Sequence, residues 1–244
     1  MVFHQLVSFR LVIFCLVLIV DTHAQDAGQL VVRKTTDFSL TSNGSASNWA
    51  KTEWVPITVQ ESSGTALATR AKLLYSDTGV YFLFFCEDQK LTATLTEDFA
   101  SLFKEDVVEV FLWPDQSVPI YLEYEISPLN YELAILVPNL NGKFQGWRPW
   151  HYQGAQRTRH ETSVQGGEKK SLSAIKSWMA EFFIPYRLLQ PLVQTPPKPG
   201  SQWRANLYRI DYDQGYTTWT WQKTTPRTAG NFHEFKKYGT LIFE

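Results

Sequence analysis

A carboxylate stands in the middle of a segment whose other residues are mostly large and apolar. In the stretch Glu105-Asp-Val-Val-Glu-Val-Phe-Leu-Trp113, alternation places Glu109 on the same strand face as Val107, Phe111 and Trp113. A buried carboxylate lowers stability unless a cation or hydrogen-bond donors compensate its charge. Glu109 is therefore predicted to meet an arginine, a metal or a ligand hydroxyl.

The next predicted strand, residues 120–127, repeats the pattern. Tyr121, Glu123 and Glu125 share the face opposite to its apolar side chains. If the two segments pair as antiparallel strands, Glu109 shares a sheet face with Glu123 or Glu125. That face could be the polar floor of a binding site, or it could supply the two carboxyl groups that glycoside hydrolysis requires.

Arg209 is the natural partner for Glu109, because its rigid guanidinium can hold a carboxylate and still donate to a ligand oxygen. Alternation in residues 203–211 places Arg209 and Leu207 on one face of the predicted strand and Tyr208 on the opposite face. A purely structural ion pair between Arg209 and Glu109 is the alternative to a ligand site.

Aromatic residues make up 15% of the chain and include nine tryptophans, so flat surfaces for ligand rings are abundant. Sugar rings pack their C–H faces on aromatic side chains, and their hydroxyls then need polar partners at the edge. Four aromatic residues in predicted loops are candidate platforms for a sugar, although each could equally be packed in the core or in a loop: Phe103, Trp147, Trp150 and Phe232.

Period-two alternation between turn residues recurs along the chain, and sustained helical periodicity is absent from the sequence. Strands are predicted at residues 69–75, 80–86, 107–113, 120–127, 133–137, 178–184, 204–211, 217–221 and 239–243. A single helical turn is predicted at 185–189, with polar connections at 139–150 and 153–170. The sequence thus predicts one all-β domain, residues 25–244, folded as a two-sheet antiparallel β-sandwich of jelly-roll or immunoglobulin-like type.

The first residues have the features of a signal peptide. Residues 11–20 are uniformly apolar, and Ala24 follows a small residue at the spacing that signal peptidase recognises. Ten apolar residues are too few for a membrane span, which needs about 20. We therefore predict a signal peptide at residues 1–24 and an exported protein, periplasmic or extracellular.

Charge and cysteine content narrow the function further. The net charge is −1, and lysines and arginines are scattered, so no nucleic-acid or anionic-membrane partner is predicted. After removal of the leader only Cys86 remains, and one thiol cannot close an intramolecular disulfide. Its place in the predicted strand, directly after Phe84 and Phe85, predicts a buried, unreactive thiol.

Over residues 30–244 the chain resembles the carbohydrate-binding module family 9-like domains, which are β-sandwiches found alone or attached to polysaccharide-degrading enzymes. The resemblance rests on six ordered motifs: Leu74-Tyr-Ser-Asp-Thr-Gly-Val-Tyr81, Glu105-Asp-Val-Val-Glu-Val-Phe111, Tyr124-Glu-Ile-Ser-Pro128, Trp178-Met-Ala-Glu-Phe-Phe-Ile-Pro185, Arg204-Ala-Asn-Leu-Tyr-Arg209 and Phe235-Lys-Lys-Tyr-Gly-Thr-Leu241.

The resemblance implies a site in which two tryptophans clasp a terminal sugar above a carboxylate. The carboxylate matches Glu109, but Phe103 and Phe232 stand where the family has its tryptophans. Further polar positions implied by the resemblance are Glu125, Tyr208 and Asn231. Some members carry structural calcium, yet no Asp-rich loop here has a suitable ligand spacing, so no metal and no cofactor are expected.

These observations favour non-catalytic binding of a mono-, oligo- or polysaccharide in support of polysaccharide breakdown, alongside glycoside hydrolases. The first alternative is a glycoside hydrolase that uses Glu109 with Glu123 or Glu125. A second alternative is a haem domain with Met179 and one of three histidines as ligands, namely His151, His160 or His233.

Overall fold

The computed structural model describes residues 28–244 apart from 66, 141–142, 191, 194–195 and 226–231. The predicted signal peptide, residues 1–24, lies outside the described residues. The strands are β1 (Gln29–Lys34), β2 (Val55–Glu61), β3 (Thr69–Tyr75), β4 (Gly79–Glu87), β5 (Val107–Trp113), β6 (Ile120–Ile126), β7 (Glu132–Leu140), β8 (Lys143–Phe144), β9 (Arg148–Pro149), β10 (Arg159–Gln165), β11 (Ser177–Pro185), β12 (Gln202–Asp211), β13 (Thr217–Thr220) and β14 (Gly239–Phe243). Short helical turns are η1 (Ser47–Lys51), η2 (Leu102–Lys104), η3 (Gly154–Gln156), α1 (Tyr186–Leu189) and η4 (Phe235–Lys237).

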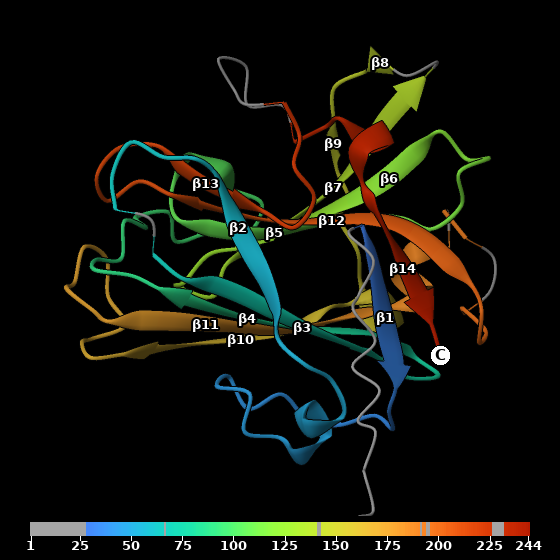
Figure 1. Ribbon diagram of the computed structural model, residues 1–244, viewed down its shortest axis with the longest axis horizontal. Helices are drawn as coiled ribbons and strands as arrows, with labels where there is room; N and C mark the ends of the chain where they lie inside the picture. The colour runs from blue at the N-terminus through green and yellow to red at the C-terminus, as the bar shows by residue number, and fades with distance from the viewer. Residues whose placement is uncertain (1–27, 66, 141–142, 191, 194–195, 226–231) are drawn as a thin grey trace, which may run out of the picture.

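The strands form two layers (Figure 1). One layer has the order β14-β12-β5-β6-β7, with β13 also paired to β12, and the other has β3-β4-β11-β10. Within both layers these neighbours are antiparallel. Two strands join the layers: β1 pairs parallel with β14 and β3, and β2 pairs antiparallel with β13 and β3. The predicted β-sandwich is confirmed, with β1 adding parallel pairing that was not foreseen.

The main core fills the space between the layers. Val108, Val110 and Leu112 of β5 point into it, as the alternation of this segment predicts. From the opposite layer, Phe82 stacks on Phe182, with ring centroids 5.1 Å apart. Burying one such side chain contributes about 1.5–3 kcal/mol, so this core accounts for stability without a disulfide.

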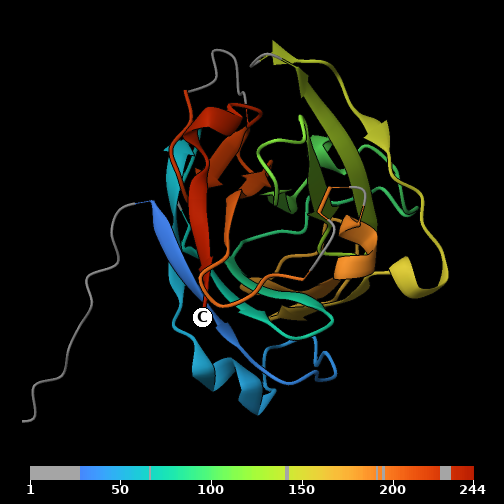
Figure 2. The same cartoon turned by 90° about the vertical axis from the view of Figure 1, so that its right-hand side faces the viewer.

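Each layer also carries an apolar cluster on its outer face. On the β12-β5-β6-β7 layer, Phe111 and Tyr121 pack against Phe235 and Tyr238 of the segment that leads into β14. On the other layer, Trp49 of the β1–β2 connection covers Tyr81 and Met179; this connection is the blue-to-cyan segment below the sandwich in Figure 1. Connecting segments therefore pack on part of each outer face; Figure 2 shows the blue one at the bottom of the sandwich.

Each of the nine predicted strands is present, but five further strands of the described chain were not predicted: β1, β2, β8, β9 and β10. Strand β10 lies in the segment 153–170, which the sequence presents as a polar connection. Among the described strands it pairs with β11 alone, and its residues are mostly exposed or half-buried, so it needs no apolar alternation.

The predicted helical turn is present as α1. In the described part of the chain, no helix has the length and apolarity that crossing a membrane requires.

Candidate functional site

A cavity of about 340 Å³ opens on the outer face of the β12-β5-β6-β7 layer. Its base consists of strand residues, and its walls are mainly aromatic residues from the surrounding loops. The residues of the base are Glu109, Phe111, Glu123, Ile135 and Ile210, and the residues of the walls are Phe103 and Lys104 of η2, Phe144 of the short strand β8, and Trp147, Tyr212, Tyr216, Phe232 and His233 of the loops.

Three carboxyl groups gather at the base of this cavity. Glu109 lies directly opposite Glu125 in the β5–β6 pairing, and Glu123 is opposite Phe111, so all three point to one sheet face. One oxygen from each carboxyl lies within 4.8 Å of the others. Glu109 and Glu123 are 1% and 5% exposed, and Glu125 lies beneath them with no exposure. The polar floor that the sequence predicted therefore forms, with both Glu123 and Glu125 in it.

Burial disfavours the charged forms of these three carboxyl groups. It raises the pKa of Glu123 to about 8, and burial together with the Glu123 charge raises the pKa of Glu109 well above its usual range. The pKa of Glu125 is raised by burial and by the charges of Glu109 and Glu123. Among the described residues, neither Glu109 Oε2 nor Glu123 Oε2 has a hydrogen-bond partner. The floor thus presents polar atoms that a ligand can satisfy.

The nearest basic groups do not neutralise the floor. His233 Nδ1 lies 3.8 Å from Glu123 Oε2, but burial lowers the pKa of His233 to about 4, so its ring is neutral. The same nitrogen is 2.8 Å from the Tyr121 hydroxyl. Lys104 is exposed, with Nζ 5.9 Å from the centre of the Phe103 ring.

Arg209 lies on the opposite face of β12, and the predicted pairing with Glu109 is wrong. The register places Tyr208 beside Glu109 and Arg209 beside Val108. The Arg209 guanidinium is fully buried in the main core, 2.7 Å from Asp211 and 3.1 Å from Asp88. It therefore cannot contact a ligand in the cavity.

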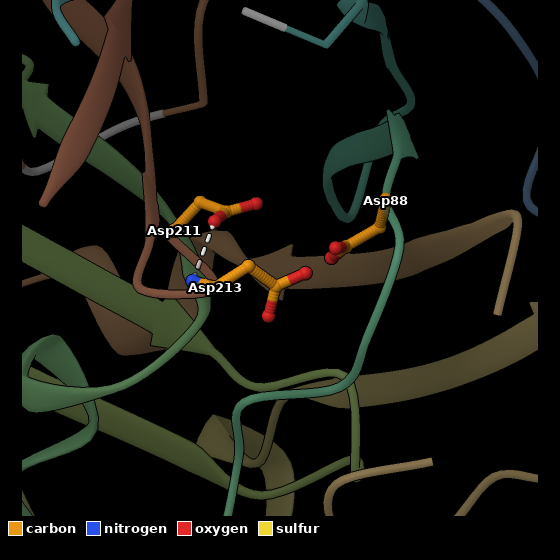
Figure 3. Close-up of side chains that lie close together, drawn as sticks. All are labelled: Asp88, Asp211 and Asp213. Atoms are coloured by element: carbon orange, nitrogen blue, oxygen red, sulfur yellow. Dashed lines mark hydrogen bonds between the residues drawn. The ribbon is translucent and has the colours of Figure 1, made fainter. Parts of the chain in front are cut away.

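The acidic group around Arg209 is a second place where carboxylates converge. Figure 3 shows Asp88, Asp211 and Asp213 pointing toward one another, and one oxygen from each lies within 4.8 Å of the others. Asp88 Oδ1 accepts from the Gln89 and Lys90 amides, and Oδ2 accepts from the Trp178 indole beside the guanidinium. These contacts satisfy both oxygens of Asp88 without a divalent ion, and the nearby guanidinium charge opposes one.

Two of the predicted aromatic platforms border the cavity from different segments. Phe232 stacks on Tyr208 with ring centroids 4.0 Å apart and is 7% exposed. Phe103, in η2, is half-buried at the cavity wall. The Tyr208 hydroxyl is fully buried and donates to the Phe232 carbonyl, so Tyr208 supports this platform from behind. Asn231 lies outside the described residues.

Only one of the two candidate tryptophans lies at the cavity. Trp147 lines the cavity, whereas Trp150 packs against the main core and donates its indole N–H to the Leu188 carbonyl.

The haem alternative is not supported by the placement of its residues. Met179 is buried in the outer cluster of one layer, whereas His233 lies at the cavity on the other layer. His160 bonds to Asn130 Oδ1, and His151 packs on Phe99, so neither of these rings is placed against Met179.

Sequence reasoning missed several wall residues. Phe144, Tyr212 and Tyr216 were not singled out, and His233 was considered only as a haem ligand, although Phe144 stacks on His233 with ring centroids 4.3 Å apart. Tyr212 follows directly on β12, whose alternate residues Tyr208 and Ile210 face the same side, and this was the available signal; Tyr216 directly precedes β13. Phe144 carried no such signal, because it comes from a distant connection.

Solved structures show the same fold. A Bacteroides uniformis protein, provisionally described as carbohydrate-binding, superposes with a TM-score of 0.72 at 16% identity, covering 88% of this chain and 99% of its own. Two structures of a family 9 carbohydrate-binding module from Caldicellulosiruptor kristjanssonii, with cellotriose and with glucose, give TM-scores of 0.61 and 0.59 at 15% and 16% identity. They cover 88% of this chain and 93% and 95% of theirs.

None of the curated proteins matches the chain. The sequence profile of one family does, over residues 42–244, which include β2–β14 and every residue placed at the cavity. On this match the chain belongs to the carbohydrate family 9 binding domain-like family.

Proposed function

We propose that the chain binds a saccharide, as a single unit or at the end of a longer glycan, in the cavity above Glu109. The observation that carries this proposal is the pair of buried oxygens, Glu109 Oε2 and Glu123 Oε2, which lack hydrogen-bond partners among the described residues and lie beneath aromatic walls. Sugar hydroxyls supply the missing partners, while the ring faces pack on the aromatic side chains.

The shape and lining of the cavity favour a small ligand. Its volume of about 340 Å³ is at the lower end of the range of about 300–1,000 Å³ for small-molecule sites. Phe103 and Phe232 come from different segments and give walls on which a ring can pack. The solved family 9 module from Caldicellulosiruptor kristjanssonii holds glucose and cellotriose, which supports a saccharide as the ligand here.

Binding without cleavage fits the placement of the carboxyl groups better than hydrolysis does. A glycosidase holds its two carboxyl groups on either side of the scissile bond. Here Glu109, Glu123 and Glu125 lie side by side on one sheet face, and Glu125 is fully buried.

We infer a role in carbohydrate catabolism, alongside glycoside hydrolases, for an exported protein of the periplasm or the extracellular space.

Calorimetric titration with glucose, cellobiose, cellotriose and other small saccharides tests the proposal. We expect saturable binding, weakened about tenfold or more by Glu109→Gln and by Phe103→Ala, because each removes a direct ligand contact. Trp150→Phe is the matched control, since this loop aromatic lies away from the cavity. Release of reducing ends would establish hydrolysis instead, and a folded chain that binds none of the sugars would contradict the proposal.

A further inference from the structure

The base of the cavity carries carboxyl groups whose charge, when they ionise, a neutral sugar does not balance. The described ionisable side chains that line the cavity are Glu109, Glu123, Lys104, Tyr212, Tyr216 and His233, and the fully buried Glu125 lies beside Glu109 on the neighbouring strand. His233 is neutral because its pKa is lowered, and Lys104 is exposed. Three carboxyl groups therefore converge under aromatic rings with no described cation among them.

We propose that the cavity prefers an amino sugar, with its protonated amine seated over Glu109 and Glu123, to the corresponding neutral sugar. This inference rests on the proposed saccharide site and narrows its ligand. An ammonium group brings three N–H donors and a positive charge to two buried oxygens that lack partners among the described residues.

The walls favour the same ligand. The faces of aromatic rings attract cations within about 6 Å of the ring centre. Phe111 projects from the base beside the carboxyl groups, and Phe103, Trp147 and Phe232 contribute walls. A buried carboxylate pair surrounded by aromatic rings is the combination that recognises organic ammonium groups.

A divalent metal fits this place less well. Calcium takes six to eight oxygen ligands. The three carboxyls converge, but most of the other residues that line the cavity are aromatic, and the nearby Tyr208 hydroxyl is already bonded to the Phe232 carbonyl and the Asn206 amide. An ammonium group needs about three acceptors, which Glu109 and Glu123 can supply together with water.

Binding of the amine is coupled to release of protons. Because burial raises the pKa values of Glu109, Glu123 and Glu125, the empty cluster holds protons that an entering ammonium displaces into solvent. A neutral sugar displaces none. Proton release is therefore a signature of this inference that simple occupancy of the cavity does not produce.

The experiment compares glucosamine, glucose and N-acetylglucosamine with the intact chain at about pH 6.5, where the glucosamine amine is protonated. We expect glucosamine to bind about tenfold or more tighter than glucose, and N-acetylglucosamine to show no such gain. Titrations in two buffers of different ionisation enthalpy should report proton release for glucosamine alone. In Glu123→Gln the ratio of the two affinities should fall toward one, and in the control Glu53→Gln it should not change.

The outcomes separate this inference from the proposed function. Equal affinities for glucose and glucosamine would overturn the amine preference and leave saccharide binding intact. A preference that survives both Glu109→Gln and Glu123→Gln would overturn it too. Calcium chloride that competes with glucosamine would identify the carboxyl cluster as a metal site instead. Failure of every sugar to bind would overturn the proposed function itself.

Discussion

Phe232 and Tyr208 lie face to face, with ring centroids 4.0 Å apart and ring planes 9° from parallel. The Tyr208 hydroxyl also donates to the Phe232 backbone carbonyl, which accepts a second hydrogen bond from Tyr238. One strand residue thus fixes both the ring and the backbone of a cavity wall. We therefore expect Tyr208 to affect ligand binding through Phe232.

Removing the Tyr208 ring should therefore reduce sugar affinity more than removing its hydroxyl. Tyr208→Phe keeps the stacking and should lower the free energy of unfolding by about 1 kcal/mol, with sugar affinity nearly unchanged. Tyr208→Leu removes the stacked ring and should lower affinity as well. Urea unfolding and calorimetry on the two variants check this. Equal losses of affinity would show that the hydroxyl itself contacts the ligand.

The stability of the chain should fall as pH rises through the range in which the carboxyl cluster loses its protons. The pKa of Glu123 is raised from 4.5 to about 8, and those of Glu109 and Glu125 are raised as well. Between these pH values the folded chain holds protons that the unfolded chain has released. The resulting contribution to the free energy of unfolding is complete below about pH 4.5 and is lost as the pH rises toward 8.

Urea unfolding at several pH values between about 5 and 8 measures this contribution. Glu123→Gln should make the decline in unfolding free energy shallower, because an amide does not titrate. Glu53→Gln, which alters an exposed carboxylate, should leave the slope as it is. Parallel curves for the unmodified chain and Glu123→Gln would show that Glu123 ionises alike in the folded and unfolded states.

Arg209 should matter for stability rather than for recognition. Its guanidinium lies between Asp88 and Asp211 with no exposure, so Arg209→Met leaves both carboxylates without their cation. Breaking a buried ion pair from one side costs about 3–5 kcal/mol. Thermal unfolding should show this loss, and adding Asp88→Asn should recover part of it. An Arg209→Met variant as stable as the original chain would contradict the structural role.

Cys86 should be unreactive until the chain unfolds. It has no exposure, and burial raises the pKa of its thiol to about 12. A thiol reagent should label the native protein slowly and the denatured protein at once. We propose that the predicted signal peptide, which contains the other cysteine, Cys15, is removed on export, and we then expect one thiol per denatured chain. Two thiols per chain would show that the leader is retained.

The sequence was informative wherever neighbouring residues decide the structure. Alternation in β5 and β6 predicted which side chains face the core and which surround Glu109. It could not predict which face of β12 lies beside Glu109, since that depends on the register between distant strands. Arg209 was therefore assigned to the wrong side. Phe144 and His233 meet only through the folded loops, and no local pattern predicts such a contact.

The position of β1 has a consequence for how the sandwich forms. This strand lies along β14, with Gln29 beside Thr240, so the pairing joins the first and last described strands across nearly the whole chain. Contacts between such distant segments form slowly, because the loop-closure entropy is lost before the contact stabilises anything. We therefore expect β1 to pair late in folding, after β3 and β14 have formed. Until then, the strand edges of β3 and β14 that pair with β1 are unpaired. Over that interval these edges are the part of the molecule most exposed to pairing with another chain.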